Sequence, residues 1–153
     1  MDTLLTVLHV VGAVFIVGPM AILPQTAMRA VRSGQAGQVK TLATSTMIFT
    51  WLSLIVFVLG FGVMGMSKYD ISFADTWIWL SVVLYVIAFL VSMFVVVPSM
   101  RKAATALAGV DAAAGAGADG TKPERAGYPA IAAGSGITAL LLLVVVILMV
   151  WHP

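Results

Sequence analysis

Four long stretches of the chain contain no Asp, Glu, Lys or Arg, at residues 3–28, 41–66, 76–100 and 126–151. Each holds about 25 residues, or roughly 38 Å of α-helix, whereas the hydrocarbon core of a bilayer is about 30 Å thick. The strands of a membrane barrel would instead be alternating segments of about 10 residues. We therefore predict an all-α bundle of four transmembrane helices, with the first helix kinked at its prolines.

The composition places the whole chain in lipid. Of its 153 residues, 61% are hydrophobic and 9% are charged, and the mean hydropathy is +1.11. Soluble domains carry about 25% charged residues. We expect one integral membrane domain over residues 1–153. The chain has no cysteine, which excludes disulfides, iron–sulfur clusters and thiol catalysis.

The basic residues predict the topology. Seven of the eight basic residues fall in the segments that join helix 1 to helix 2 and helix 3 to helix 4, namely Arg29, Arg32, Lys40, Arg101, Lys102, Lys122 and Arg125. The positive-inside rule places these segments in the cytoplasm, so we expect a plasma-membrane protein with both termini outside. The first five of these residues should contact phospholipid headgroups rather than nucleic acid. Residues 101–125, rich in Ala and Gly, are expected to form a flexible cytoplasmic loop.

His9 is the first candidate for chemistry. A polar side chain inside a membrane helix usually faces the bundle, where it forms an interhelical hydrogen bond or serves a function. We favour a hydrogen-bonded packing residue. The alternatives are an axial ligand of haem b, or a contact to a proton or a quinone. A six-coordinate haem needs a second ligand, for which the sequence offers the other histidine, His152, or methionines such as Met64 and Met66.

The same helix contains two glycines and two prolines. Pro19 and Pro24 each remove a backbone donor, and Gly12 and Gly18 allow another backbone to approach. Transporters place binding sites at such broken helices. No charged side chain accompanies this one, so we predict a bent helix that packs against partners, with a small oligomeric permease as an alternative.

Small and hydroxyl-bearing residues predict further helix packing. Ala130, Gly134 and Gly136 follow the four-residue spacing of close helix contacts, and Ser or Thr at 44, 45, 46, 50 and 53 can hydrogen-bond across helices. The sequence shows no catalytic residue set and no metal-ligand set, so we expect no enzyme activity and no cofactor of its own. "ILPQTAMRAVRSG" at the end of helix 1 also echoes "VVVPSMRKAATALAG" at the end of helix 3, as in a two-helix repeat.

The opening "LLTVLHVVGAVFIVGPMAILP" and the four-helix plan resemble a family of uncharacterised bacterial integral membrane proteins. That family is distantly similar to copper-resistance D and HemJ-type proteins, whose first helix also has a Leu-His start followed by small residues. In the HemJ-type proteins this histidine is linked to haem. His9 matches it, whereas the further membrane histidine and lysine of that group have no counterpart here. In layout the chain also resembles a small association subunit of the actinobacterial respiratory supercomplex, which joins a cytochrome bcc complex to an aa3 oxidase. This resemblance implies a non-catalytic accessory role in respiratory electron transport, with other membrane subunits and phospholipids as partners. The alternatives are a haem- or quinone-linked redox protein that uses His9, and the permease.

Overall fold

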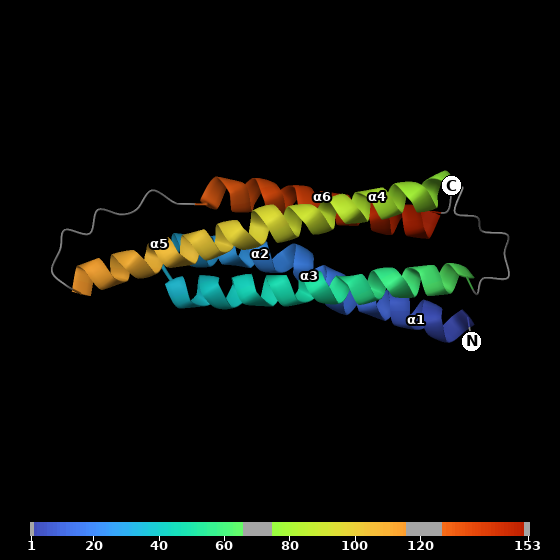
Figure 1. Ribbon diagram of the computed structural model, residues 1–153, viewed down its shortest axis with the longest axis horizontal. Coiled ribbons are helices and arrows are strands. Elements are labelled where there is room, and N and C mark those ends of the chain that lie inside the picture. The colour runs from blue at the N-terminus through green and yellow to red at the C-terminus, as the bar shows by residue number, and fades with distance from the viewer. Residues whose placement is uncertain (1, 66–74, 116–126, 152–153) are drawn as a thin grey trace.

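The computed structural model describes residues 2–65, 75–115 and 127–151 and shows a bundle of four long helices (Figure 1). All four are long and apolar enough to cross a membrane, and the regular structure of the described residues is entirely helical. The predicted all-α, four-span fold is therefore confirmed. α1 begins and α6 ends at one end of the bundle, which we call the terminal end; the opposite end, where α2 meets α3, we call the basic end.

Two of the four spans contain short π-helical turns. In chain order the elements are α1 (Asp2–Gly12), η1 (Ala13–Val17) and α2 (Gly18–Arg32) in the first span, α3 (Ala36–Gly65) in the second, α4 (Thr76–Val91), η2 (Ser92–Val96) and α5 (Val97–Gly115) in the third, and α6 (Tyr128–Trp151) in the fourth.

Proline explains both π turns. In a regular helix the ring of Pro19 would collide with the carbonyl of Phe15, and the ring of Pro98 with the carbonyl of Phe94. The chain widens instead: the N–H of Gly18 bonds the carbonyl of Ala13, five residues back, and the N–H of Val97 does the same with Ser92.

The two π turns bear on the internal repeat. Each π turn has a phenylalanine as its third residue and ends two residues before a proline, so Phe15 and Pro19 of the first span match Phe94 and Pro98 of the third. The sequence echo had placed Pro24 opposite Pro98. The π turns therefore align the first span with the third at Pro19 and Pro98, and the two-helix repeat itself stays a prediction.

The connection between α2 and α3 is a tight turn. The N–H of Gln35 bonds the carbonyl of Ala30 at 3.0 Å, and the N–H of Gly34 bonds that of Val31 at 3.2 Å. Gly34 has a φ of +74°, so this is the glycine-terminated pattern that commonly ends helices. α3 consequently begins at Ala36, five residues before the predicted start, and its first two turns are not a loop.

The third span continues well past its predicted end. α5 runs to Gly115, so residues 101–115, expected as the first part of a flexible loop, are helical. Ala is the best helix former, and Ala103 and Ala104 are buried against neighbouring helices, which holds this segment in place. The rest of the predicted loop, residues 116–125, lies outside the described residues, as does Ala126, the predicted start of the fourth span.

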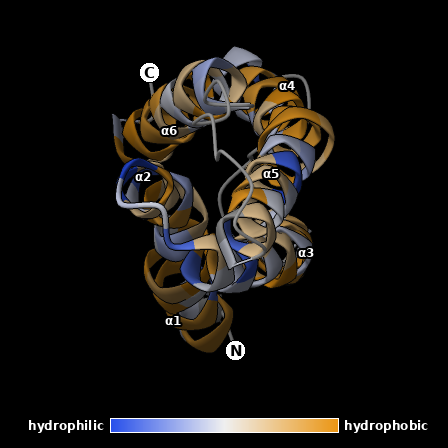
Figure 2. Ribbon diagram, turned by 90° about the vertical axis from the view of Figure 1, so that its left-hand side faces the viewer, coloured by the Kyte–Doolittle hydropathy of each residue, from blue (hydrophilic) through white to orange (hydrophobic). Residues whose placement is uncertain are grey.

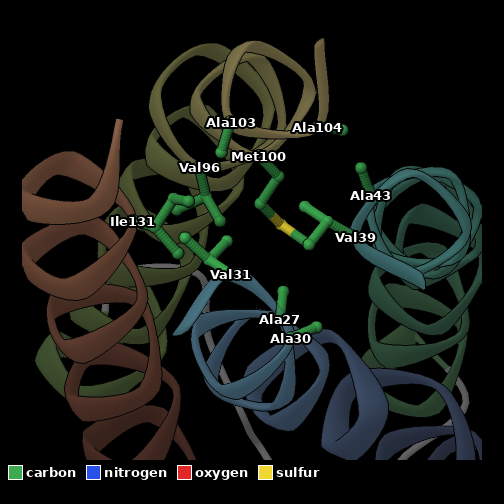
Figure 3. Packing of buried hydrophobic residues seen from close by; sticks show 10 residues of the cluster. All are labelled: Ala27, Ala30, Val31, Val39, Ala43, Val96, Met100, Ala103, Ala104 and Ile131. Carbon is green, nitrogen blue, oxygen red and sulfur yellow. The ribbon is translucent and has the colours of Figure 1, made fainter. Parts of the chain in front are cut away.

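The larger cluster of buried hydrophobic residues is formed mainly by α2, α3 and α5, near the turn that joins α2 to α3 (Figure 3). Met100 extends from α5 toward Val39 of α3, and both side chains are fully buried. The cluster draws mainly on small residues of α2, α3 and α5, which lets these helices approach closely. Its members are Ala27, Ala30, Val31, Val39, Ala43, Val96, Met100, Ala103, Ala104 and Ile131.

The helices pack differently at the terminal end. There α1 packs mainly against α3, and α4 packs against α6, whereas α2 contacts both α3 and α6 and α5 contacts α3. Viewed along the bundle, α1 lies at the edge, and much of the helical ribbon has the colour of hydrophobic residues (Figure 2). The bundle thus consists of two halves, spans 1–2 and spans 3–4, which are joined most extensively near the basic end.

Candidate functional site

His9 forms a hydrogen bond that joins α1 to α3. Its Nδ1 lies 2.9 Å from the carbonyl oxygen of Val56, and the side chain is half-buried. Because a carbonyl can only accept, Nδ1 carries the hydrogen and donates it. In the neutral imidazole, Nε2 is then the nitrogen with the free lone pair.

Two glycines make room for this contact. A Cβ atom on Gly60 of α3 would lie 3.0 Å from Cε1 of His9, and a Cβ atom on Gly12 of α1 would lie 2.9 Å from Cγ2 of Val56. Gly12 was predicted from the sequence, but Gly60 and Val56 were not. The signal that could have found Gly60 is the small-residue run "GFGVMG" at the end of helix 2.

Hydroxyl groups join the two halves of the bundle further inside. Tyr85 of α4 lies 2.7 Å from Ser53 of α3, and Ser92 of η2 lies 3.0 Å from Thr50 of α3, oxygen to oxygen. Ser53 donates its hydrogen to the Thr50 carbonyl at 2.7 Å, and Thr50 donates its own to the Thr46 carbonyl at 2.8 Å. A hydroxyl has a single hydrogen to give. Tyr85 and Ser92 must therefore be the donors across the helix contact.

Aromatic rings surround these hydroxyls. The rings of Phe57 and Tyr85 stack with centroids 4.7 Å apart and an interplanar angle of 12°, and Phe61 packs edge-on against Phe57 at 4.8 Å. The Tyr85–Ser53 bond is consequently shielded on one side by hydrocarbon. Of the five Ser and Thr positions proposed for helix 2, Thr50 and Ser53 bond another helix, whereas Thr44 and Thr46 bond carbonyls of their own helix.

The other predicted packing residues differ in their surroundings. A Cβ atom on Gly134 of α6 would lie 2.8 Å from Cγ2 of Val96, so this glycine sits in a close helix contact. Gly18 and Gly136 have no atom within 4 Å of the corresponding position, and they are not points of close approach. Ala130 is half-buried near the start of α6.

The two prolines of the first span lie in different environments. Pro24 is fully buried inside α2, and Pro19 is half-buried where α2 begins. Only Pro19 adjoins a π turn, so the interruption of the first span is at Pro19 rather than equally at both.

The predicted headgroup residues lie around the basic end, and all are exposed. The Arg32 guanidinium lies 5.2 Å from the centre of the Tyr128 ring, and Nη2 of Arg101 lies 3.0 Å from the sulfur of Met47. Both contacts hold an arginine against the side of the bundle without neutralising its charge. The exposed basic residues are Arg29, Arg32, Lys40, Arg101 and Lys102.

Among the described residues, no three His, Cys, Asp or Glu side chains come close enough together to hold a metal ion. Of the predicted second haem ligands, Met64 is half-buried near the end of α3, while Met66 and His152 fall outside the described residues. His9 itself donates Nδ1–H to a carbonyl, which is the arrangement typical of ligating histidines.

A family sequence model, described as a predicted integral membrane protein (DUF2269), matches residues 3–153. The chain belongs to this family. Comparisons with curated proteins and with solved structures give no match. The match covers all four spans of this DUF2269 protein, including His9 and the hydroxyl network, and supports the predicted uncharacterised membrane family.

Proposed function

We propose that this DUF2269 protein is a non-catalytic subunit that binds other membrane proteins through helix packing. The proposal rests on one observation: polar groups inside the membrane-spanning helices form hydrogen bonds within the chain. His9 Nδ1 is engaged by the Val56 carbonyl, and the hydroxyls of Ser53 and Thr50 donate to backbone carbonyls. The hydrogen bonds of these groups hold the helices of the chain together.

The first span offers the surface for a partner. α1 packs mainly against α3, so most of its circumference is left to lipid or to another protein. Large apolar side chains cover this side, and Phe15 in η1 is 70% exposed. The exposed large apolar side chains on the first span are Leu4, Val7, Leu8, Val10, Val11, Val14, Phe15 and Ile22.

The layout resemblance suggests which partners to test first. It points to redox subunits of the plasma membrane, in particular components of a cytochrome bcc complex and an aa3 oxidase. In that setting the basic end faces the cytoplasm, the termini face outward, and exposed arginines such as Arg29 contact anionic headgroups. Support for the membrane assembly comes from the apolar surface; the respiratory partner rests on the resemblance alone.

Extraction of the tagged protein from its own membrane in a mild detergent, followed by mass spectrometry, tests this proposal. We expect redox subunits to co-purify, and Phe15→Ala to reduce their recovery several-fold. Phe94→Ala is the matched control, because Phe94 occupies the same place before its proline and is 71% exposed. Recovery of only free monomer or homodimer, or equal loss with both variants, would contradict the proposal.

A second candidate is a haem- or quinone-linked redox protein, and the His9 geometry favours it. Donation from Nδ1 leaves Nε2 free to bind a metal. Comparing His9→Asn with His9→Ala separates the two candidates, since the Asn amide can still donate to the Val56 carbonyl but cannot replace Nε2. A Soret band present in the natural protein and lost in both variants favours haem. Absence of the band, with stability retained only by His9→Asn, favours the packing role.

A further inference from the structure

Thr138 in α6 has a buried hydroxyl with no hydrogen-bond partner. Its side chain is 2% exposed, and its Oγ1 has no donor or acceptor within reach among the described residues. Other threonine hydroxyls behave differently and bond the carbonyl four residues earlier in their own helix. These are Thr26, Thr41, Thr44, Thr46, Thr50 and Thr105. The Thr138 hydroxyl therefore has an unused hydrogen in the apolar interior.

Pro24 leaves a backbone carbonyl of α2 without its usual hydrogen-bond donor. A regular helix would supply the N–H of residue 24 to the carbonyl of Met20, but proline has none. Met20 is 0% exposed, and Pro24 is fully buried. In the membrane interior, a carbonyl freed by proline must be satisfied by a neighbouring helix, a side chain or an ordered water.

The Thr138 hydroxyl and the Met20 carbonyl lie at about the same level of the bundle. Met20 packs in one buried cluster with Leu142 of α6, and Thr138 lies one turn before Leu142 on the same face of that helix. Helix carbonyls point toward the C-terminal end, so the Met20 oxygen points toward the basic end. Thr138 lies in that direction from Leu142, because α6 runs away from the basic end.

We propose that a buried water molecule binds between α2 and α6 and bridges these groups. Thr138 Oγ1 donates a hydrogen to the water oxygen, and the water donates to the carbonyl of Met20. A buried water typically makes two to four hydrogen bonds, and both groups here are neutral, as suits water rather than a cation. The water links α2 of one half of the bundle to α6 of the other half.

The direction in which Thr138→Val changes the unfolding midpoint temperature tests the proposal. Valine has nearly the shape of threonine, so removing an orphaned hydroxyl would raise the unfolding midpoint temperature. Removing one arm of a bridging water lowers it instead, and we expect a decrease of about 2–4 °C. Thr46→Val is the matched control, because Thr46 is 0% exposed and its hydroxyl bonds the carbonyl of Leu42 in its own helix. Its midpoint should stay within about 1 °C. A rise with Thr138→Val overturns the proposal.

Pro24→Ala then shows whether Met20 is the other arm. Alanine restores the N–H donor to the Met20 carbonyl, so the effect of Thr138→Val should vanish or change sign in that background. An equal decrease in both backgrounds would place the water elsewhere and overturn the assignment. An experimental structure of the natural protein provides a separate check. It should show density within hydrogen-bond distance of both oxygens, and an empty site would reject the proposal.

Discussion

The hydroxyl of Tyr85 donates a 2.7 Å hydrogen bond to Ser53 Oγ, and this bond joins the two halves of the bundle. Its direction follows from the next bond, in which Ser53 gives its own hydrogen to the Thr50 carbonyl. The pair is buried, and the Tyr85 ring stacks on Phe57. α3 and α4 therefore meet through a polar contact inside a hydrocarbon surround.

Tyr85→Phe should remove this bond while keeping the ring in its stack. Interhelical hydrogen bonds in membranes contribute about 0.6 kcal/mol on average, and up to about 1.7 kcal/mol. We expect a loss of about 1 kcal/mol in the free energy of unfolding, measured by reversible denaturation in mixed micelles. Ser53→Ala should destabilise more, since it leaves the Tyr85 hydroxyl buried without an acceptor. The double variant should be no worse than Ser53→Ala alone; additive losses would show that the two residues are not coupled.

Gly60→Ala should disturb the His9 contact. The new Cβ would lie 3.0 Å from His9 Cε1, so the imidazole must shift away from the Val56 carbonyl. We expect a destabilisation of about 1 kcal/mol, as for mild overpacking. Gly62→Ala is the control, because its Cβ would meet only Leu5 at an ordinary 3.8 Å. In a His9→Ala background the penalty at Gly60 should disappear, and its persistence there would point to a cause other than the histidine.

Gly134→Ala should separate α6 from the third span. Its Cβ would approach Val96 Cγ2 to 2.8 Å, and Val96 is 0% exposed and has no space to yield. Overpacking of this kind costs about 1–3 kcal/mol. Gly136→Ala, two residues away, meets open space and should be neutral or slightly stabilising. Thermal melts of both variants in one detergent check the difference, and equal midpoints would refute the close contact.

Gly127→Ala should be the most damaging single-methyl substitution at the start of α6. Gly127 has a φ of +82°, and its Cβ would lie 2.7 Å from the backbone oxygen of Ser99, which cannot move as a side chain can. Gly34→Ala shares the positive φ of +74° but has open space around it, so it should show only the backbone penalty of about 1–2 kcal/mol. Expression yield and midpoint temperature should fall further for Gly127→Ala, and matching losses would mean that the Ser99 contact contributes nothing.

Some features of the site could be predicted from the residues alone. A histidine inside a membrane helix predicts a hydrogen-bonded packing role, and His9 does bond a neighbouring helix. The acceptor could not be predicted, because any carbonyl of any adjacent helix could serve. Likewise, Gly134 and Gly136 look alike in sequence, and only the position of Val96 distinguishes the tight contact from the open one.

The same distinction applies to the ends and interruptions of the helices. Pro19 and Pro24 are equivalent by local rules, yet only Pro19 adjoins a π turn. The basic and Ala-rich residues 101–115 suggested a loop, because charge marks the membrane boundary but not the end of a helix. Burial of Ala103 and Ala104 against helices distant in sequence keeps this segment helical.

By itself, the sequence determined that the chain crosses the bilayer four times as helices, because transfer into hydrocarbon depends on the length and composition of each segment taken alone. The tertiary structure decided which hydroxyl meets which acceptor, which glycines lie in close helix contacts, and that the buried Thr138 hydroxyl has no partner among the described residues. Those outcomes depend on the register between helices, and a few ångströms of register, which no single segment encodes, separate a hydrogen bond from an unpaired group.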